Sequence, residues 1–168
     1  VRNAGGEGIQ GWNSTVTVSG EEVFGSSGGG LWLWGCTAEV SGSRVYANFG
    51  NGVGALYYSV VTVGGSELFG NVGYGAYNQD GSATFNADGN WWGAADGPSG
   101  AGTGSGDEVS AGVSYGSALT TGSKFSYIDA GGTAQEGTIG APVVVSGTAS
   151  SEWGNDAGHS VLYDMQEV

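Results

Sequence analysis

Basic residues are almost missing from this chain. Its 168 residues include 16 acidic side chains but only Arg2, Arg44 and Lys124 as basic ones, so the net charge at pH 7 is -13. Proteins bind nucleic acids and anionic membranes through clustered Lys and Arg side chains. Three dispersed basic residues cannot form such a cluster, so we expect no nucleic acid as a partner and no attraction to an anionic membrane.

Cysteine and long apolar segments are equally scarce. Cys36 is the single cysteine, so it cannot form a disulfide within the chain. The sequence has no run of about 18 apolar residues, the length that a membrane-spanning helix needs, and we expect no membrane insertion. It opens on strand-like Val1 without Met or a signal peptide, which indicates a processed product or one part of a longer polypeptide.

Glycine is abundant, with 37 residues, and hydrophobic residues make up 39% of the chain. The glycines follow no G-X-Y period, which excludes collagen, and a disordered linker would have a lower apolar content. Val, Thr, Tyr, Trp and Phe recur in short groups between Gly, Asn, Asp and Ser. This pattern is typical of short strands joined by tight turns.

Several groups of residues repeat with one period. An apolar–aromatic pair recurs at Val23-Phe24, Val45-Tyr46 and Leu68-Phe69. The last glycine of a Gly-x-Gly motif recurs at Gly8, Gly30, Gly52 and Gly75. A period near 22 residues with three short strands per repeat is one turn of a parallel β-helix, and the Leu pattern of leucine-rich repeats is absent.

Stacking of these repeats predicts which residues lie above one another. We expect two inward columns, one of Ile9, Leu31, Val53 and Ala76 and one of Val23, Val45 and Leu68. The glycine before each first strand is expected to adopt the positive φ of a tight corner. Ser26, Asn48 and Asn71 are expected to form a polar ladder at another corner.

Two segments resemble a known superfamily. Asn90-Trp91-Trp92-Gly93 and the Gly-rich stretch after it are similar to a loop found late in β-helices of the pectate-lyase-like superfamily. Residues 137–168 are similar to a rung that opens such helices. The resemblance implies an all-β, right-handed parallel β-helix of the surface type without lyase activity. It divides the chain into β-helix rungs over 1–93, a long Gly-rich loop over 94–112, and strands over 113–168 that resemble an opening rung continuing into the next unit.

No group of residues matches a catalytic site, and we expect no enzyme. Lyases of that superfamily place acidic calcium ligands beside a basic residue, and its hydrolases combine clustered Asp residues with a Gly-His-Gly segment and a basic pair. Arg44 is the only basic residue within the repeats, and His159 is the only histidine. Neither has the partners that these mechanisms need, so we interpret Arg44 as an outward-facing strand residue.

Calcium is the one cofactor that the sequence suggests. Carboxylates in the Gly-rich loops could converge on a hard cation, which prefers oxygen ligands. The candidate ligands are Asp80, Asp88, Asp96, Asp107 and Glu108. The alternative is that these residues are ordinary turn formers, since Asp is common in turns.

Aromatic residues provide the candidate binding surface. Successive side chains of a strand point to opposite faces, so if Leu31 and Leu33 point inward, Trp32 and Trp34 point outward. Trp12 lies one period before Trp34, and Tyr77 falls in the column of Trp32. An exposed aromatic surface indicates contact with a sugar or a protein. The alternative is burial of these rings beneath the long loop or the tail.

Three functions remain open. The first is an extracellular or cell-surface structural protein whose units stack head to tail with copies of themselves into a filament. The second is a polysaccharide-binding surface module or adhesin, and the third is a fragment of a polysaccharide lyase or hydrolase. We favour the first, because the strand-like Val1 and the strand-like tail near Tyr163 both suggest open ends that template further pairing.

Overall fold

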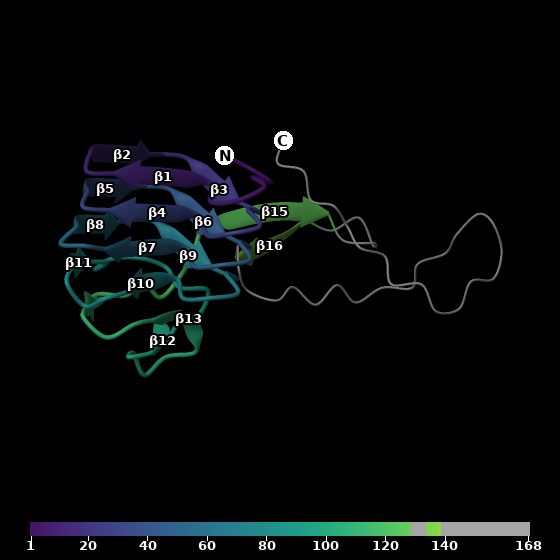
Figure 1. Cartoon of the computed structure of the whole chain (residues 1–168). Coiled ribbons are helices and arrows are strands. Elements are labelled where there is room, and N and C mark those ends of the chain that lie inside the picture. Colours follow the sequence, from purple (N-terminus) through teal and green to yellow (C-terminus); the bar gives the residue numbers. More distant parts are fainter. Residues whose placement is uncertain (129–133, 139–168) are drawn as a thin grey trace.

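Every regular element that the computed structural model describes, over residues 1–128 and 134–138, is a β-strand (Figure 1). Three parallel sheets wind around one axis, so that successive turns of the chain stack on one another. Among the described residues we find no helix with the length and hydropathy needed to cross a bilayer. The prediction of an all-β parallel solenoid with rungs of about 22 residues is confirmed.

Each of the first three turns contributes one strand to every sheet. In spatial order, the first sheet consists of β1 (Ile9–Trp12), β4 (Leu31–Trp34), β7 (Val53–Leu56), β10 (Ala76–Asn78), β13 (Gly106–Val109) and β12 (Pro98–Gly100). The second consists of β14 (Val113–Ser114), β11 (Thr84–Asn86), β8 (Val60–Gly64), β5 (Thr37–Ser41) and β2 (Thr15–Ser19). The third consists of β3 (Glu22–Phe24), β6 (Arg44–Tyr46) and β9 (Glu67–Phe69).

The strand register confirms the predicted inward columns. Leu31 is paired with Ile9 on one side and with Val53 on the other, and Val53 is paired in turn with Ala76. Strands paired in parallel keep the same faces, so each column points to one side of the sheet. The core combines this column with one from each other sheet, made of Val18, Val40 and Val63 and of Val23, Val45 and Leu68.

The repeated glycines before each first strand do not have the role expected from the sequence. Positive φ angles occur instead at later corners, such as those of Gly20 and Gly42. A Cβ atom on Gly30 would lie 2.6 Å from the carbonyl oxygen of Gly52 in the next turn, and Gly8 has the same close approach to the turn of Gly30. Glycine is needed at these positions because successive backbones lie too close together for a side chain.

The predicted polar ladder is present and is longer than expected. Asn48 Oδ1 accepts a hydrogen bond from the Ser26 backbone N–H at 3.1 Å, and Asn48 Nδ2 donates to Asn71 Oδ1 at 3.0 Å. Asn71 Nδ2 donates in turn to Asp107 Oδ2 at 2.9 Å. Because Asn48 is fully buried, these bonds satisfy polar groups that water cannot reach.

The segment expected as a Gly-rich loop contains two strands and covers one end of the solenoid. Val109 of β13 pairs with Ala76 of β10, and β12 pairs with β13. The chain turns back so tightly that the Gly106 N–H donates to the Gly97 carbonyl at 2.9 Å, and a Cβ on Gly106 would collide with the Trp92 backbone. Residues 94–112 therefore continue the stack, because their glycines let the backbone approach the turn above.

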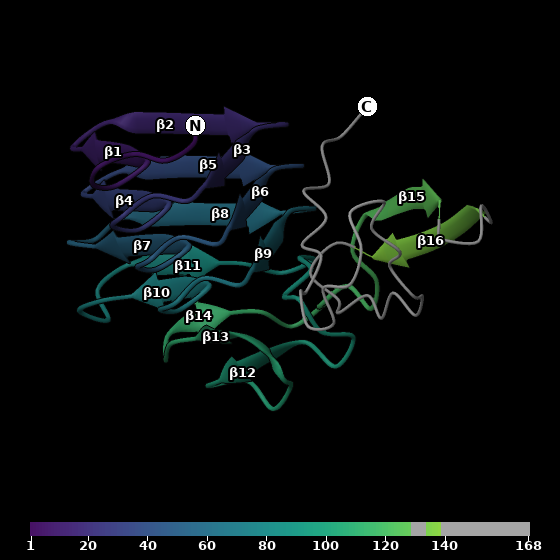
Figure 2. The same cartoon turned by 90° about the vertical axis from the view of Figure 1, so that its right-hand side faces the viewer.

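The strands after this segment also differ from the expected opening rung. β14 pairs with β11 and so extends the second sheet. β15 (Lys124–Ile128) and β16 (Ala134–Thr138) form an antiparallel hairpin that belongs to none of the three solenoid sheets (Figure 2). β14 thus adds one strand to the stack, and β15 and β16 lie outside it. Residues 129–133 and 139–168, which include most of the segment predicted as an opening rung, lie outside the described part of the chain.

Candidate functional site

The four predicted surface aromatics lie on the outer face of the first sheet, in two columns. Trp12 and Trp34 are directly paired across β1 and β4, and their rings stack with centroids 5.2 Å apart. Trp12 is 57% exposed, whereas Trp34 is half-buried. The structure therefore brings these two tryptophans together on the surface, as the sequence predicted.

Trp32 and Tyr77 occupy the neighbouring column, with Gly54 between them in the register. A Cβ on Gly54 would lie 2.6 Å from the Trp32 ring, so the ring covers the backbone at this glycine. Tyr77 stacks on Tyr74 with centroids 4.8 Å apart. Both Trp32 and Tyr77 are half-buried, and their rings stabilise the face of the sheet as well as forming part of its surface.

Two further aromatic residues at the corner after β7, missed in the sequence, continue the stack of rings from Trp12 and Trp34. Tyr57 stacks on Trp34 with centroids 5.1 Å apart, and Tyr58 contacts Tyr57 edge-on at 5.7 Å. Tyr57 is 51% exposed and Tyr58 76% exposed. Trp12, Trp34, Tyr57 and Tyr58 thus form one continuous set of ring contacts at the corner between the first and second sheets, which we call the corner ladder.

The backbone of the corner ladder is strained at both tyrosines. Tyr57 and Tyr58 have φ angles of 54° and 55°, in the left-handed region. For a residue other than glycine this conformation costs roughly 1–2 kcal/mol. The equivalent positions of the two preceding turns are taken by Asn13 and Gly35, which adopt positive φ at lower cost.

Hydrogen bonds to acceptors in the next turn hold this strained corner. The Tyr57 backbone N–H donates to Asp80 Oδ2 at 3.1 Å, and the Tyr58 N–H donates to Ser82 Oγ at 2.9 Å. Hydrogen bonds from the Ser82 side chain and backbone and from Tyr57 hold the pKa of Asp80 below its ordinary value. In the sequence, the only sign of this site is a Tyr-Tyr pair at a corner where the period lengthens by one residue.

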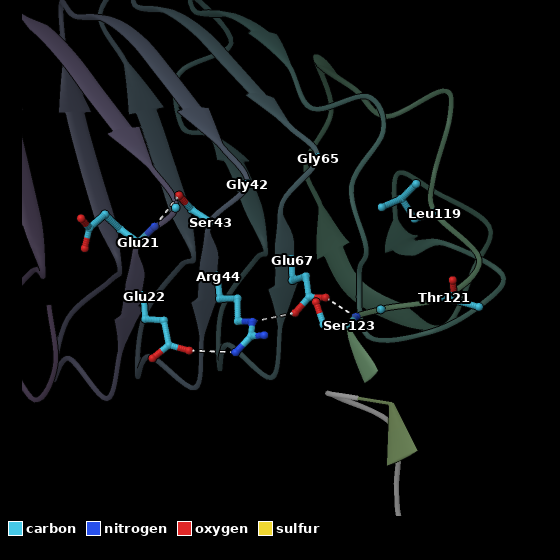
Figure 3. Close-up of a pocket in the computed structure, with 12 residues that line it drawn as sticks. Glu21, Glu22, Gly42, Ser43, Arg44, Gly65, Glu67, Leu119, Thr121 and Ser123 are labelled. Atoms are coloured by element: carbon cyan, nitrogen blue, oxygen red, sulfur yellow. Dashed lines mark hydrogen bonds and ion pairs between the residues drawn. The ribbon is translucent and has the colours of Figure 1, made fainter. Parts of the chain in front are cut away.

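Charged residues gather in a cleft at the corner between the second and third sheets, beside residues 119–123 (Figure 3). The cleft has a volume of about 540 Å³. In its wall, Arg44 Nη1 lies 3.0 Å from Glu22 Oε1, and Arg44 Nε lies 3.3 Å from Glu67 Oε2. The Ser123 backbone N–H donates to Oε1 of the buried Glu67.

This arrangement is a structural charge ladder. Glu22, Arg44 and Glu67 are directly opposite one another across β3, β6 and β9, and opposite charges at paired positions stabilise a sheet. A guanidinium between two carboxylates stays protonated and cannot remove a proton from a substrate. Arg44 points outward from its sheet, and its ion pairs give it a structural role.

The five candidate calcium ligands are not brought together. In the part of the chain that the structure describes, no three His, Cys, Asp or Glu side chains form a group that could hold a metal ion. Asp88 accepts hydrogen bonds from Ser114 Oγ and Asp96 from Ser105 Oγ, both at 2.9 Å. Asp107 ends the polar ladder, and Glu108 is exposed. Asp80, Asp88, Asp96 and Asp107 therefore act as separate acceptors that fix turns and corners.

One end of the solenoid has open strand edges, and we call it the open end. Among the described residues, β1 and β2 are the outermost strands of the first and second sheets. Ile9 and Val16 in these strands are only half-buried, whereas their partners Leu31 and Ala38 are buried. The edge of the third sheet is covered instead, because Arg2 bridges to Phe24 of β3.

The opposite end is protected against strand addition. Its outermost strand in the first sheet is β12, which has three residues, begins with Pro98 and has an irregular register. The outermost strand of the second sheet is β14, which has two residues. Short edge strands, proline and bulges all hinder pairing with another chain.

Comparison of the chain with family models, curated proteins and solved structures finds no match. The structure supports the parallel β-solenoid fold that the resemblance implied. No match supports the pectate-lyase-like superfamily itself.

Proposed function

We propose that the chain is a structural β-solenoid unit outside the cell or on its surface, and that it binds another copy of itself at the open end. The observation that carries this proposal is the half-buried pair Ile9 and Val16, which lies at the edge of two parallel sheets above a continuous apolar core. Unpaired strand edges of this kind template further pairing, and added strands would bury both side chains.

The occupant that we propose for the open end is the segment 139–168 of a second copy. Its sequence includes Val143-Val144-Val145 and Ser160-Val161-Leu162-Tyr163, and it is longer than one 22-residue rung. The protected end of the solenoid is a poor partner because its edge strands are short. Since the two contacting surfaces differ, each copy can bind one neighbour on either side, which produces a filament.

The test uses two full-length variants that block opposite surfaces. The backbone N–H groups of Ile9 and Asn13 donate to the carbonyls of Gly30 and Trp34, so strand alternation directs the Gln10 N–H away from β4. Gln10→Pro removes this edge donor, and Val144→Asp adds a charge to the proposed occupant. We expect each variant to be monomeric by light scattering, whereas Gln10→Ala and the unchanged chain form filaments visible by negative-stain electron microscopy.

Mixing the two variants gives the sharper result. Gln10→Pro retains a functional tail and Val144→Asp retains a functional open end, so the mixture should form dimers and no longer species. An unchanged chain that stays monomeric at high concentration would contradict the proposal. So would a mixture that contains only monomers while each variant keeps the circular dichroism spectrum of the folded protein.

The location outside the cell rests on the resemblance to surface-type β-helices and has its own test. A net charge of -13 keeps such filaments soluble and opposes their lateral association. An antibody against the purified chain should detect it in the medium or on intact cells of the source organism. Detection only after lysis would contradict this part of the proposal.

The corner ladder favours a second function, the binding of a polysaccharide. Three of its four side chains, those of Trp12, Tyr57 and Tyr58, are exposed, and the ladder borders the outer face that carries Trp32 and Tyr77. We assign no catalytic residue, since Arg44, the basic residue in the charged cleft, is ion-paired with Glu22 and Glu67.

A further inference from the structure

We propose that the corner ladder is the binding site of this second function, that Tyr57 and Tyr58 make the main contact, and that the ligand is an uncharged polysaccharide. The inference rests on the proposed polysaccharide binding and adds to it the site and the class of ligand. The site differs from the one predicted from the sequence, because two of its four residues are tyrosines that the sequence pattern did not indicate.

About half of the Tyr57 side chain and most of the Tyr58 side chain lie in solvent. Tyr58 is 76% exposed, and its ring makes an angle of 63° with that of Tyr57. An edge-on contact leaves at least one face of the Tyr58 ring in solvent. The Trp12 ring, by contrast, stacks on Trp34 and lies at the open end, where a second copy would cover its outer side.

The strained backbone points to the same two residues. Asn13 and Gly35 show that this corner can be formed by residues that tolerate positive φ. The third turn instead has two consecutive tyrosines there, and strain of this kind persists only where the surrounding structure imposes it. Here Asp80 and Ser82 impose it through hydrogen bonds to both tyrosine N–H groups. The backbone at both tyrosines is therefore fixed before a ligand arrives, and contacts with the rings of Trp34 and Tyr57 restrict the side chains, which lowers the entropy cost of binding.

The arrangement of the rings indicates a polymer with a repeating unit. The ladder adds one ring per turn from Trp12 to Tyr57, with centroid spacings of 5.2 Å and 5.1 Å. None of its residues lines the charged cleft, and three of its four side chains are exposed, so the ladder is a row on the outside of a corner. A long chain lying along such a row can contact successive rings, whereas a small molecule gains only one contact.

The negative charge of the protein favours an uncharged ligand. The net charge of -13 repels polyanions, and the carboxylate nearest to the tyrosines, Asp80, keeps its charge because its pKa is lowered. Among the described side chains the basic ones are Arg2, which bridges to β3, and Arg44, which is ion-paired on the third sheet. Neither lies on this corner to bind uronate or sulfate groups. Tyrosine rings and hydroxyls suit the C–H faces and hydroxyls of a neutral sugar.

The experiment compares four full-length proteins: the unchanged chain, Tyr58→Gly, Trp32→Ala and Phe49→Ala. Phe49 is the matched control because it is 70% exposed and projects from the corner that follows the third sheet. Binding is measured by co-sedimentation with cellulose and chitin, by affinity electrophoresis in a soluble neutral β-glucan, and with polygalacturonate as the acidic probe. We expect binding to at least one neutral polysaccharide, about tenfold weaker for Tyr58→Gly and unchanged for Phe49→Ala.

Thermal stability separates a binding role from a structural one. Glycine relieves the positive φ at position 58, so Tyr58→Gly should keep its Tm or raise it by up to about 4 °C. A Tm lower by more than about 4 °C, which is beyond the roughly 1 kcal/mol that the chain entropy of glycine can cost, would show that the ring supports the fold and would overturn the inference.

The remaining outcomes separate the site from the function. Loss of binding in Trp32→Ala but not in Tyr58→Gly would overturn the site and leave polysaccharide binding intact. Equal losses in Tyr58→Gly and Phe49→Ala would show unspecific adhesion and overturn the site. Binding to polygalacturonate alone would overturn the inference of an uncharged ligand and leave the second function standing. No binding to any of the polysaccharides would overturn both the inference and the second function.

Discussion

At the scale of single residues, the end of the polar ladder makes stability depend on pH. Asp107 accepts hydrogen bonds from the Gly70 N–H at 2.7 Å and from Asn71 Nδ2 at 2.9 Å. Burial nevertheless raises the pKa of Asp107, because its effect exceeds that of these hydrogen bonds. The folded protein therefore holds the Asp107 proton more tightly than the unfolded chain does.

The sign of the pH effect follows from this difference. Stability from a raised pKa is fully present below the ordinary Asp pKa of about 3.9 and is lost as the pH rises through the folded value. We expect Asp107→Asn to flatten the fall in the free energy of unfolding as the pH rises from about 4. Urea unfolding across pH 3–7 measures this curve.

Asp96 provides the control for this measurement. Hydrogen bonds from the backbone and side chain of Ser105 lower its pKa, so its contribution to stability is lost only as the pH falls below about 3.9. Asp96→Asn should change the curve only in that acidic range. Parallel curves for Asp107→Asn and the unchanged chain above pH 4 would refute the role of Asp107.

The polar ladder also shows which residues can be positioned from the sequence alone. Ser26, Asn48 and Asn71 were predictable because each lies one period from the next. Asp107 was not, since an insertion separates it from Asn71 by 36 residues. Tyr58 was missed for a different reason, because a backbone that forces a tyrosine to positive φ leaves no mark in a hydrophobic pattern.

At the scale of strands, the distance between successive turns decides which glycines are essential. A Cβ on Gly30 would lie 2.5 Å from Val45 Cγ1 and 2.6 Å from the Gly52 carbonyl oxygen. At Gly42, where φ is 55°, a Cβ would meet nothing within 4 Å. Gly30 is therefore required because there is no space for a side chain, whereas Gly42 is required because the backbone has a positive φ.

This difference predicts an order of effects. Gly30→Ala should lower the free energy of unfolding by about 3 kcal/mol or more, because backbone and core atoms must both move. Gly42→Ala should cost only about 1 kcal/mol, the strain of alanine at positive φ. Chemical denaturation of both variants gives the comparison. Equal losses would mean that turn-to-turn spacing is not limiting at Gly30.

Strand predictions from the sequence succeed only where the period holds. The first nine strands repeat every 22 or 23 residues, and stacking alone places them. The period is broken in residues 94–112, so the sequence predicts a loop from their glycines. In the structure the same glycines let the backbone approach the turn above, and the segment contains β12 and β13. The antiparallel hairpin of β15 and β16 has no counterpart in the repeat, which gave no basis for predicting it.

At the scale of the whole molecule, net charge governs the response to ions. A charge of -13 destabilises the compact state through repulsion, and salt screens that repulsion. The described carboxylates lie at separate sites, so calcium should act on them as a counterion rather than as a bound ligand.

Thermal melting distinguishes the two effects of calcium. NaCl and CaCl2 at equal ionic strength should raise Tm by similar amounts, and EDTA should have no effect in NaCl. A specific site at 100 times its Kd would add about 2.7 kcal/mol beyond screening. A larger shift with CaCl2 that EDTA reverses would contradict this prediction and support a calcium site.

The constant register has a consequence for how fast the chain folds. Pairings between the stacked strands of the first three turns join residues 22 or 23 positions apart, whichever turns they belong to. The entropy lost on closing a loop depends on the loop length, so each new turn meets the same kinetic barrier as the one before. In most β-proteins a longer chain brings more distant pairings and slower folding. Here a formed turn serves as the template for the next, and the solenoid can lengthen without its individual steps becoming slower.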